Sequence, residues 1–193
     1  LGHVRTGTTK VMETPRTTAR WSPVSAAEAE AEQLRQIKAA QLSPDERLAQ
    51  SEYKGSLYSA WNAALRRAGG DDSKIPPEFA DRTKRLDAAI ARHVLPTDLL
   101  LHRGARYDSQ FPTIASAIAQ KGFTYRNLAY SSTSTQRIVA EGFAWSADKP
   151  PAPMVVFTIR VKKGDRALAG TDYESEYIFP RGKEWRILDV EQV

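Results

Sequence analysis

The sequence predicts an α+β fold, because helical patterns fill its first half and strand patterns fill its second. Apolar residues recur at helical spacing up to about residue 93, whereas short apolar or β-branched runs between turn signals follow from residue 99 onward. Helices followed by strands favour an α+β arrangement over a parallel βαβ array. With 193 residues, of which 41% are hydrophobic, the chain can bury a core.

The amino-terminal part, residues 1–44, is predicted to be a linker or a partly ordered arm. Its first 24 residues are rich in Thr, Arg, Gly and Pro and show almost no apolar periodicity. Ser25 followed by Glu28 predicts a capped helix over residues 26–40, although that helix carries few large apolar residues. The chain starts at Leu1 without an apolar signal-peptide core, so we expect a fragment or a processed product.

The folded domain is predicted to span residues 45–193 and to begin with helices. Ser43-Pro44-Asp45-Glu46 combines a capping residue, a first-turn proline and first-turn acids, and Gly69-Gly70 ends the pattern. Gly55 predicts a break between two helices within this stretch. Pro76-Pro77 starts a further helix that ends near His93.

The second half is predicted to consist mainly of strands with two short helices. The run Leu99–Arg103 reads as a buried strand with an arginine at its end, and residues 154–161 form the strongest strand pattern. The remaining expectations are a helix over 111–120, extended segments over 123–125 and 128–135, a helix over 138–145, strands over 166–169 and 177–179, and a closing strand over 184–190.

Composition excludes several classes of site. The chain has no cysteine, which rules out disulfides, thiolate catalysis and cysteine-bound zinc, and its three histidines are too scattered for a metal cluster. No apolar run is long enough to span a membrane. The net charge is +5, but the sequence shows no dense basic face, so nucleic-acid binding is not expected. The sequence also has no Gly-rich dinucleotide-binding motif and no Walker A loop, so a Rossmann or P-loop nucleotide site is not expected.

Three polar elements of the second half carry candidate chemistry. Glu174 and Glu176 stand two residues apart, which in an extended strand directs both carboxylates to one face. Paired carboxylates repel each other unless they stabilise a cation or activate a weak nucleophile, although Glu-x-Glu also arises by chance in a charged chain. Arg103 ends a strand, and the hydroxyl-rich run Ser131–Thr135 forms another.

These elements, in this order, resemble the mono-ADP-ribosyltransferases of the Arg-Ser-Glu class, bacterial toxins and effectors that include the enzymatic components of clostridial binary toxins. Leu99-Leu100-Leu101-His102-Arg103-Gly104, Ser132-Thr133-Ser134 and Glu174-Ser175-Glu176 look like the three motifs of the class, and the stretch from Tyr53 to Arg66 resembles its preceding helix. The resemblance implies amino-terminal helices packed on two mainly antiparallel sheets that flank an NAD cleft.

The resemblance also assigns roles to the paired glutamates. Cleavage of the nicotinamide–ribose bond builds an oxocarbenium-like cation, which Glu176 would stabilise while it binds the ribose 2′-hydroxyl. Glu174 would engage the acceptor, and a glutamate at that position goes with arginine acceptors. A carboxylate suits this task because it can hold a guanidinium in a bidentate pair and help remove its proton.

The other roles concern NAD, the expected co-substrate, which is used without a metal. Arg103, next to Gly104, would pair with a phosphate, the alternative being a salt bridge at a sheet edge. Ser132 would orient Glu176. The further residues are Thr133 and Ser134 within the NAD-binding run, Phe143 against the nicotinamide or in the core, Arg106 and Asn127 as weaker NAD contacts, and Tyr173 on the acceptor side.

The sequence departs from the binary-toxin pattern at two points. Where those relatives have a second arginine after the aromatic residue, this chain has Ala144-Trp145-Ser146, so Arg106 or Arg137 would have to supply that phosphate contact. An aromatic residue expected a few positions before the first glutamate is replaced by Thr171, with Tyr173 directly before Glu174. The acceptor is therefore less firmly indicated than the co-substrate.

The predicted function is transfer of ADP-ribose from NAD to a protein side chain, preferably arginine, with release of nicotinamide. The acceptor would be a protein of a host or target cell, reached by secretion or translocation. Two alternatives remain: an NAD glycohydrolase, in which water is the acceptor, and a non-catalytic interaction module that keeps the fold.

Overall fold

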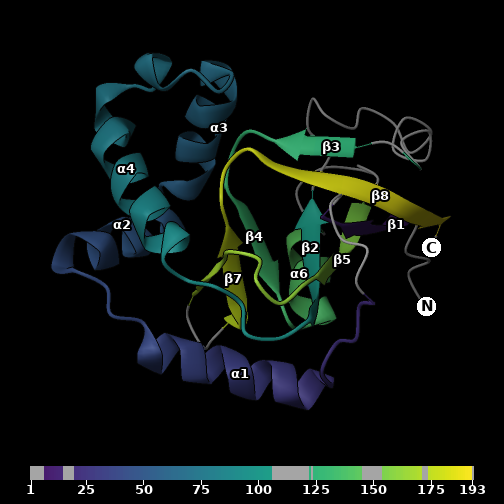
Figure 1. Ribbon diagram of the computed structural model, residues 1–193. Coiled ribbons are helices and arrows are strands. Elements are labelled where there is room, and N and C mark those ends of the chain that lie inside the picture. The colour runs from purple at the N-terminus through teal and green to yellow at the C-terminus, as the bar shows by residue number, and fades with distance from the viewer. Residues whose placement is uncertain are drawn as a thin grey trace, which may run out of the picture.

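The computed structural model describes residues 7–14, 20–105, 122, 124–144, 154–170 and 174–192, and it confirms the α+β class. A mixed sheet forms the centre, and a group of three helices lies to one side of it (Figure 1). The described strands are β1 Gly7–Glu13, β2 Leu99–Ala105, β3 Thr124–Asn127, β4 Ser131–Ser134, β5 Met154–Val161, β6 Leu168–Ala169, β7 Glu176–Phe179 and β8 Lys183–Gln192.

The strands described here follow the order β3-β8-β1-β5-β2-β4-β7-β6 in one sheet. Their pairings are antiparallel except for β1 with β5, which is parallel. Strands β2 and β4 share a single registered pair, His102 with Ser134. The two predicted sheets are thus the two halves of one sheet, β3-β8-β1-β5-β2 and β4-β7-β6, which join at that pair.

The helices are α1 Ala26–Ala39, α2 Pro44–Lys54, α3 Tyr58–Ala68, the 3-10 turn η1 Asp72–Lys74, α4 Pro77–Ala91 and α6 Arg137–Ala144. Helix α2 begins with the predicted capping box: the Glu46 amide donates to Ser43 Oγ at 3.1 Å and the Ser43 amide to Glu46 Oε2 at 2.9 Å. Gly69 ends α3 with φ of 64°, a left-handed conformation that favours glycine. These boundaries agree with the local signals.

Helices α2, α3 and α4 pack around an aromatic cluster. Trp61 is fully buried, stacks on Phe79 and meets the rings of Tyr53 and Tyr130 edge-on. Its indole N–H donates to Thr83 Oγ1 at 2.9 Å. Because Tyr130 precedes β4, this cluster fixes the helices against the half-sheet that carries the Ser-Thr-Ser motif.

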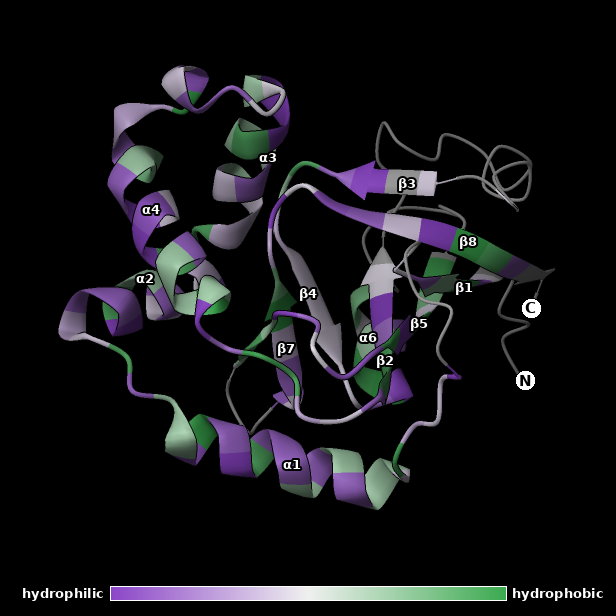
Figure 2. Cartoon of the chain, viewed as in Figure 1, coloured by the Kyte–Doolittle hydropathy of each residue, from purple (hydrophilic) through white to green (hydrophobic). Residues whose placement is uncertain are grey.

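The prediction of a linker or partly ordered arm over residues 1–44 did not include a strand, yet residues 7–13 form one. They form β1, which lies between β8 and β5 in the sheet, with Lys10 and Met12 buried. Helix α1 alternates hydrophilic and hydrophobic residues, as the purple and green bands of its ribbon show (Figure 2), and its Ala29 belongs to the core of the sheet. The backbone pairing of a strand needs no apolar pattern, which explains why the composition gave no sign of β1.

Some predicted elements fall outside the described residues, namely the helix over 111–120 and the ends of the strands around it. Among the described residues, no helix combines the length and the apolar character that a membrane crossing requires.

Candidate active site

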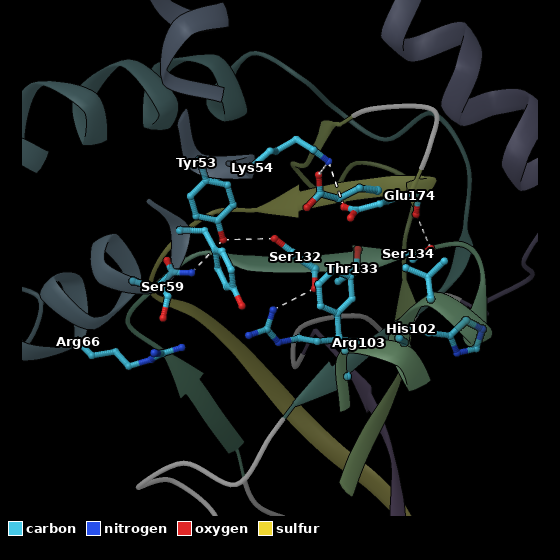
Figure 3. A pocket seen from close by; sticks show the side chains of 17 residues that line it. Tyr53, Lys54, Ser59, Arg66, His102, Arg103, Ser132, Thr133, Ser134 and Glu174 are labelled. Carbon is cyan, nitrogen blue, oxygen red and sulfur yellow. Dashed lines mark hydrogen bonds and ion pairs between the residues drawn. The ribbon is translucent and has the colours of Figure 1, made fainter. Parts of the chain in front are cut away.

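A cleft of about 330 Å³ opens where α2 and α3 face the junction of β2, β4 and β7 (Figure 3). Helix α6 lines it from the other side through Val139, Ala140 and Phe143. All three predicted motifs contribute side chains to its wall: Arg103 and Gly104 from β2, Ser132, Thr133 and Ser134 from β4, and Glu174 and Glu176 from the turn and the start of β7.

Glu176 is the most buried acid of the cleft, with 7% of its side chain exposed. Burial raises the pKa of its carboxyl; the Lys54 ammonium and hydrogen bonds from Lys54 and Ser132 oppose that rise, and Glu174 adds to it. The Lys54 ammonium contacts Glu176 Oε2 directly. A carboxylate held in this setting is poorly solvated, so it interacts strongly with any cation that forms beside it.

Glu174 also lines the cleft, but it lies in a turn and not in the strand that was predicted. This turn lies outside β7, and Ser175 between the two glutamates has φ of 47°, so the motif is not a regular alternating strand. The turn is held by Ser134, whose hydroxyl donates to the Glu174 carbonyl at 2.7 Å, and by the Thr135 amide, which donates to the Ser175 carbonyl at 3.1 Å. A non-glycine residue at positive φ costs energy and persists where its surroundings fix it.

The Ser-Thr-Ser strand supports the glutamates. Ser132 Oγ lies 3.3 Å from the Tyr53 hydroxyl, which accepts from the Asn62 amide at 3.0 Å. Thr133 Oγ1 donates to the Tyr177 carbonyl at 2.9 Å, next to Glu176 in β7. Ser132 therefore faces the cleft beside Glu176, whereas Thr133 and Ser134 fix the backbone next to it.

Arg103 extends into the cleft from β2. One guanidinium N–H donates to the Ser132 carbonyl at 3.0 Å, and no carboxylate among the described residues pairs with it. The alternative of a salt bridge at the sheet edge thus has no support in the described part of the chain. The remaining donors of Arg103 are suited to a phosphate.

Gly104 lets α6 approach β2. A Cβ at this position would lie 1.8 Å from the Ala140 carbonyl oxygen, so only glycine fits beneath the helix. The same close approach places Phe143 of α6 at the cleft, where 49% of the residue is exposed. Phe143 is therefore not part of the core, and its ring is available to a flat ligand.

Two cleft residues that the three motifs do not include carry positive charge. Lys54 ends α2 and lies between the two glutamates, with its ammonium 3.4 Å from Glu174 Oε2. Arg66 of α3 points toward Arg103 across the cleft (Figure 3), and its Nε is buried without a hydrogen-bond partner among the described residues. Both lie in the stretch from Tyr53 to Arg66, and the resemblance of that stretch to the helix of the family is the sequence signal that could have identified them.

His102 is a buried member of the cleft wall. Burial lowers its pKa to about 4, with a further contribution from the nearby Arg137. The imidazole is therefore neutral at physiological pH and adds no charge to the site.

Other predicted contacts lie elsewhere. Asn127 ends β3 and is buried, its amide donates to Ser131 Oγ at 2.9 Å, and it does not line the cleft, so the structure adds no support to an NAD contact there. Arg137 binds Glu141 and Thr9 and does not line the cleft, whereas Arg66 of α3 does line it. Arg106 and Tyr173 lie outside the described residues.

The described residues hold no group of three or more His, Asp or Glu side chains that could ligate a metal. The groups that line the cleft can instead act electrostatically, because its carboxylates can stabilise a cation and its guanidinium groups can bind phosphates.

Comparison with known proteins identifies the fold and the family. A family model described as ADP-ribosyltransferase exoenzyme matches residues 28–193. No curated protein matches significantly.

Several solved structures share the fold at low sequence identity. The C3 exoenzyme of Clostridium limosum has a TM-score of 0.69 at 19% identity, covering 89% of this chain and 90% of that one. A protein of S. aureus, solved with NAD, has a TM-score of 0.64 at 21% identity over 86% and 89% of the two chains. The ADP-ribosyltransferase Vis, from Vibrio splendidus, in complex with agmatine has a TM-score of 0.63 at 20% identity over 89% and 82%.

Proposed function

Because the chain belongs to the ADP-ribosyltransferase exoenzyme family and is an NAD-dependent mono-ADP-ribosyltransferase, we propose that it modifies arginine side chains, with Glu176 as the catalytic carboxylate. The observation that carries this proposal is the arrangement around Glu176: a buried carboxylate with a raised pKa lies in the same cleft as Glu174, Ser132 and Arg103.

NAD would be held through its phosphates and its nicotinamide ring. Arg103 and Arg66 supply guanidinium groups at one side of the cleft, and a guanidinium fork suits a pyrophosphate. Phe143 offers an exposed ring for stacking on the nicotinamide. The wall between them consists of Gly104, Ser132, Thr133 and Ser134.

The reaction breaks the bond between the ribose C1 and the nicotinamide nitrogen, and the bonding electrons leave with nicotinamide. Glu176 stabilises the ribosyl cation that develops, and it does so more strongly because water is largely excluded from it. An acceptor nitrogen then bonds to C1. The proton that this nitrogen loses passes to Glu174, the more exposed of the two acids.

Arginine as the acceptor follows from the charge and position of Glu174. Its carboxylate has 25% exposure at the mouth of the cleft, where an incoming guanidinium can form a bidentate pair. The structure of Vis holds agmatine, a small guanidine, in a protein of the same fold. This supports a guanidinium acceptor without identifying the target protein.

The protein acts on NAD and a protein acceptor. We propose that this acceptor belongs to a target cell and that the enzyme is secreted or translocated to reach it, as the family description "exoenzyme" suggests. We also propose that the functional domain includes β1 and α1, because both contact the sheet that carries the site.

The test incubates the protein with NAD and agmatine and measures nicotinamide release and ADP-ribosyl-agmatine by mass spectrometry. Glu174→Gln should lose transfer to agmatine by at least about tenfold while it keeps nicotinamide release, because the amide still lines the cleft but cannot take the proton.

If the parent releases nicotinamide at the same rate with and without agmatine and forms no adduct, the protein is an NAD glycohydrolase. If NAD neither stabilises the fold nor is consumed, the cleft is a non-catalytic module, since a ligand that binds the native state must raise its stability.

A further inference from the structure

We propose that Lys54 is a positioning residue for the reaction: its ammonium is the internal counter-ion that orients Glu176 and keeps it charged, and it links Glu176 to Glu174. This inference rests on the proposed function, in which Glu176 stabilises the ribosyl cation. Lys54 itself would not touch the reacting atoms.

The position of Lys54 is fixed by the fold. It is the last residue of α2, which breaks at Gly55, and only 11% of its side chain is exposed. The preceding residue, Tyr53, is buried against the rings of Trp61 and Tyr130 and accepts a hydrogen bond from Asn62. A lysine in this place has little room to move away from the acids.

The ammonium of Lys54 contacts both acids of the motif. It binds Glu176 Oε2 directly and lies 3.4 Å from Glu174 Oε2, as the dashed lines in Figure 3 show. Gly170 closes the other side of Glu176: its amide donates to the Glu176 carbonyl at 2.8 Å, and a Cβ there would lie 2.4 Å from Oε2. The carboxylate is thus held between the ammonium and the backbone of Gly170, which sets its rotation.

The charges around Glu176 make this counter-ion necessary. Lys54 and the Tyr53 hydroxyl face it from α2, Glu174 from the turn before β7, Ser132 from β4, and Arg103 lies beyond Ser132 on β2. Among the described residues, Lys54 is the cation in direct contact with Glu176. Burial and Glu174 both raise the pKa of Glu176, and Lys54 is the largest influence that lowers it.

Removal of the ammonium should therefore favour the protonated, inactive form of Glu176. The pKa of Glu176 would rise further, so the acid limb of the pH profile should move to higher pH. Binding of NAD should change less, because the guanidinium groups of Arg66 and Arg103 stay in place.

The experiment compares Lys54→Met with the parent in nicotinamide release without acceptor, from pH 5 to pH 9. Methionine keeps the length of the side chain and removes the charge. We expect Lys54→Met to lose roughly tenfold in kcat at pH 6 and to recover most of that loss at pH 9, since one pKa unit corresponds to a tenfold change in the charged fraction. KM for NAD should change less than twofold.

Two controls separate this role from a structural one. Lys54→Arg keeps the charge and should retain the acid limb of the parent. Lys74→Met makes the same chemical change at an exposed lysine of η1, whose ion pair with Asp71 lies outside the cleft, and should leave the profile unchanged. Thermal unfolding checks that each variant is folded.

A folded Lys54→Met variant with the acid limb of the parent overturns the proposal. Equal loss of activity at every pH also overturns it, because Glu176 would then stay charged without the ammonium. Failure of the proposed function looks different: the parent itself then releases no nicotinamide, or Glu176→Gln releases it as fast as the parent does.

Discussion

Each end of helix α2 forms an ion pair with another element, and the acids of the two pairs differ: the pKa of one is lowered and the pKa of the other is raised. At the amino end, Glu46 accepts two hydrogen bonds of 2.6 Å from Arg92 of the neighbouring α4 end, which together with the capping box lower its pKa to about 2. At the carboxyl end, Lys54 binds Glu176, yet burial raises the pKa of that acid.

This difference shows which surroundings let an ion pair stabilise the fold and which place its acid ready to stabilise a cation. Half of the Arg92 side chain is exposed, although only 10% of the Glu46 side chain is, so the guanidinium stays partly hydrated while it and the capping box satisfy the buried carboxylate. The Lys54–Glu176 pair is nearly enclosed and also contains a second acid, Glu174, at its edge. A charge placed there is costly in the resting enzyme and valuable when a cation forms beside it.

The largest expected effect comes from breaking the enclosed pair at its acid. Glu176→Gln should lower nicotinamide release by about 10²–10³-fold, because one preorganised electrostatic partner of the cation is lost. Thermal unfolding should show a folded variant of lower stability than the parent, since the nearly buried Lys54 ammonium keeps only Glu174 as a partner among the described residues. Loss of folding instead of activity would show that the pair is structural, like that of Glu46.

A smaller effect is expected from displacing the same carboxylate without removing it. Gly170→Ala places a methyl carbon 2.4 Å from Oε2 of Glu176, so the carboxylate must shift from its position against Lys54. Misplacement on this scale should cost about tenfold to a hundredfold in kcat with the fold retained. Steady-state kinetics with NAD measure it, and Gly142→Ala, at an open position of α6 outside the cleft lining, checks that glycine replacement alone does not explain the loss.

The smallest effect concerns the amino end of α2. Glu46→Gln should lower the free energy of unfolding at pH 7 by about 1 kcal/mol and leave activity unchanged. Because the pKa of Glu46 is depressed in the folded state, this stabilisation is present above the pKa of the unfolded chain and is lost as pH falls toward about 2. Denaturant unfolding at pH 7 and pH 3 should therefore show a smaller difference at the lower pH.

Local signals predicted the elements that carry the site. The caps at Ser43 and Gly69, the break at Gly55 and the apolar run into Arg103 all lie where the structure has them. The three motifs also placed Arg103, Ser132 and Glu176 correctly in one cleft. The caps, the break and the apolar run depend on residues close together in sequence. The shared cleft was predicted from the resemblance to a family whose fold brings the three motifs together.

Other features were missed or predicted differently because they depend on distant partners. Strand β1 was read as part of a linker or partly ordered arm, although its position between β8 and β5 comes from backbone pairing with residues far along the chain. Asn127 was read as an NAD contact, but it is buried, donates to Ser131 and does not line the cleft. Glu174 and Glu176 were expected to alternate along a strand, whereas Ser175 turns the chain between them.

The sequence by itself determined the α+β class, the caps of the helices and the kinds of group that the chemistry needs, because composition, periodicity and spacing act over a few residues. Only the tertiary structure decided which charges meet. Lys54 is one lysine among many until α2 ends beside β7 and brings its ammonium to two glutamates about 120 positions later in the chain. Burial and long-range contact, which no local pattern encodes, make that cation a partner of the reaction.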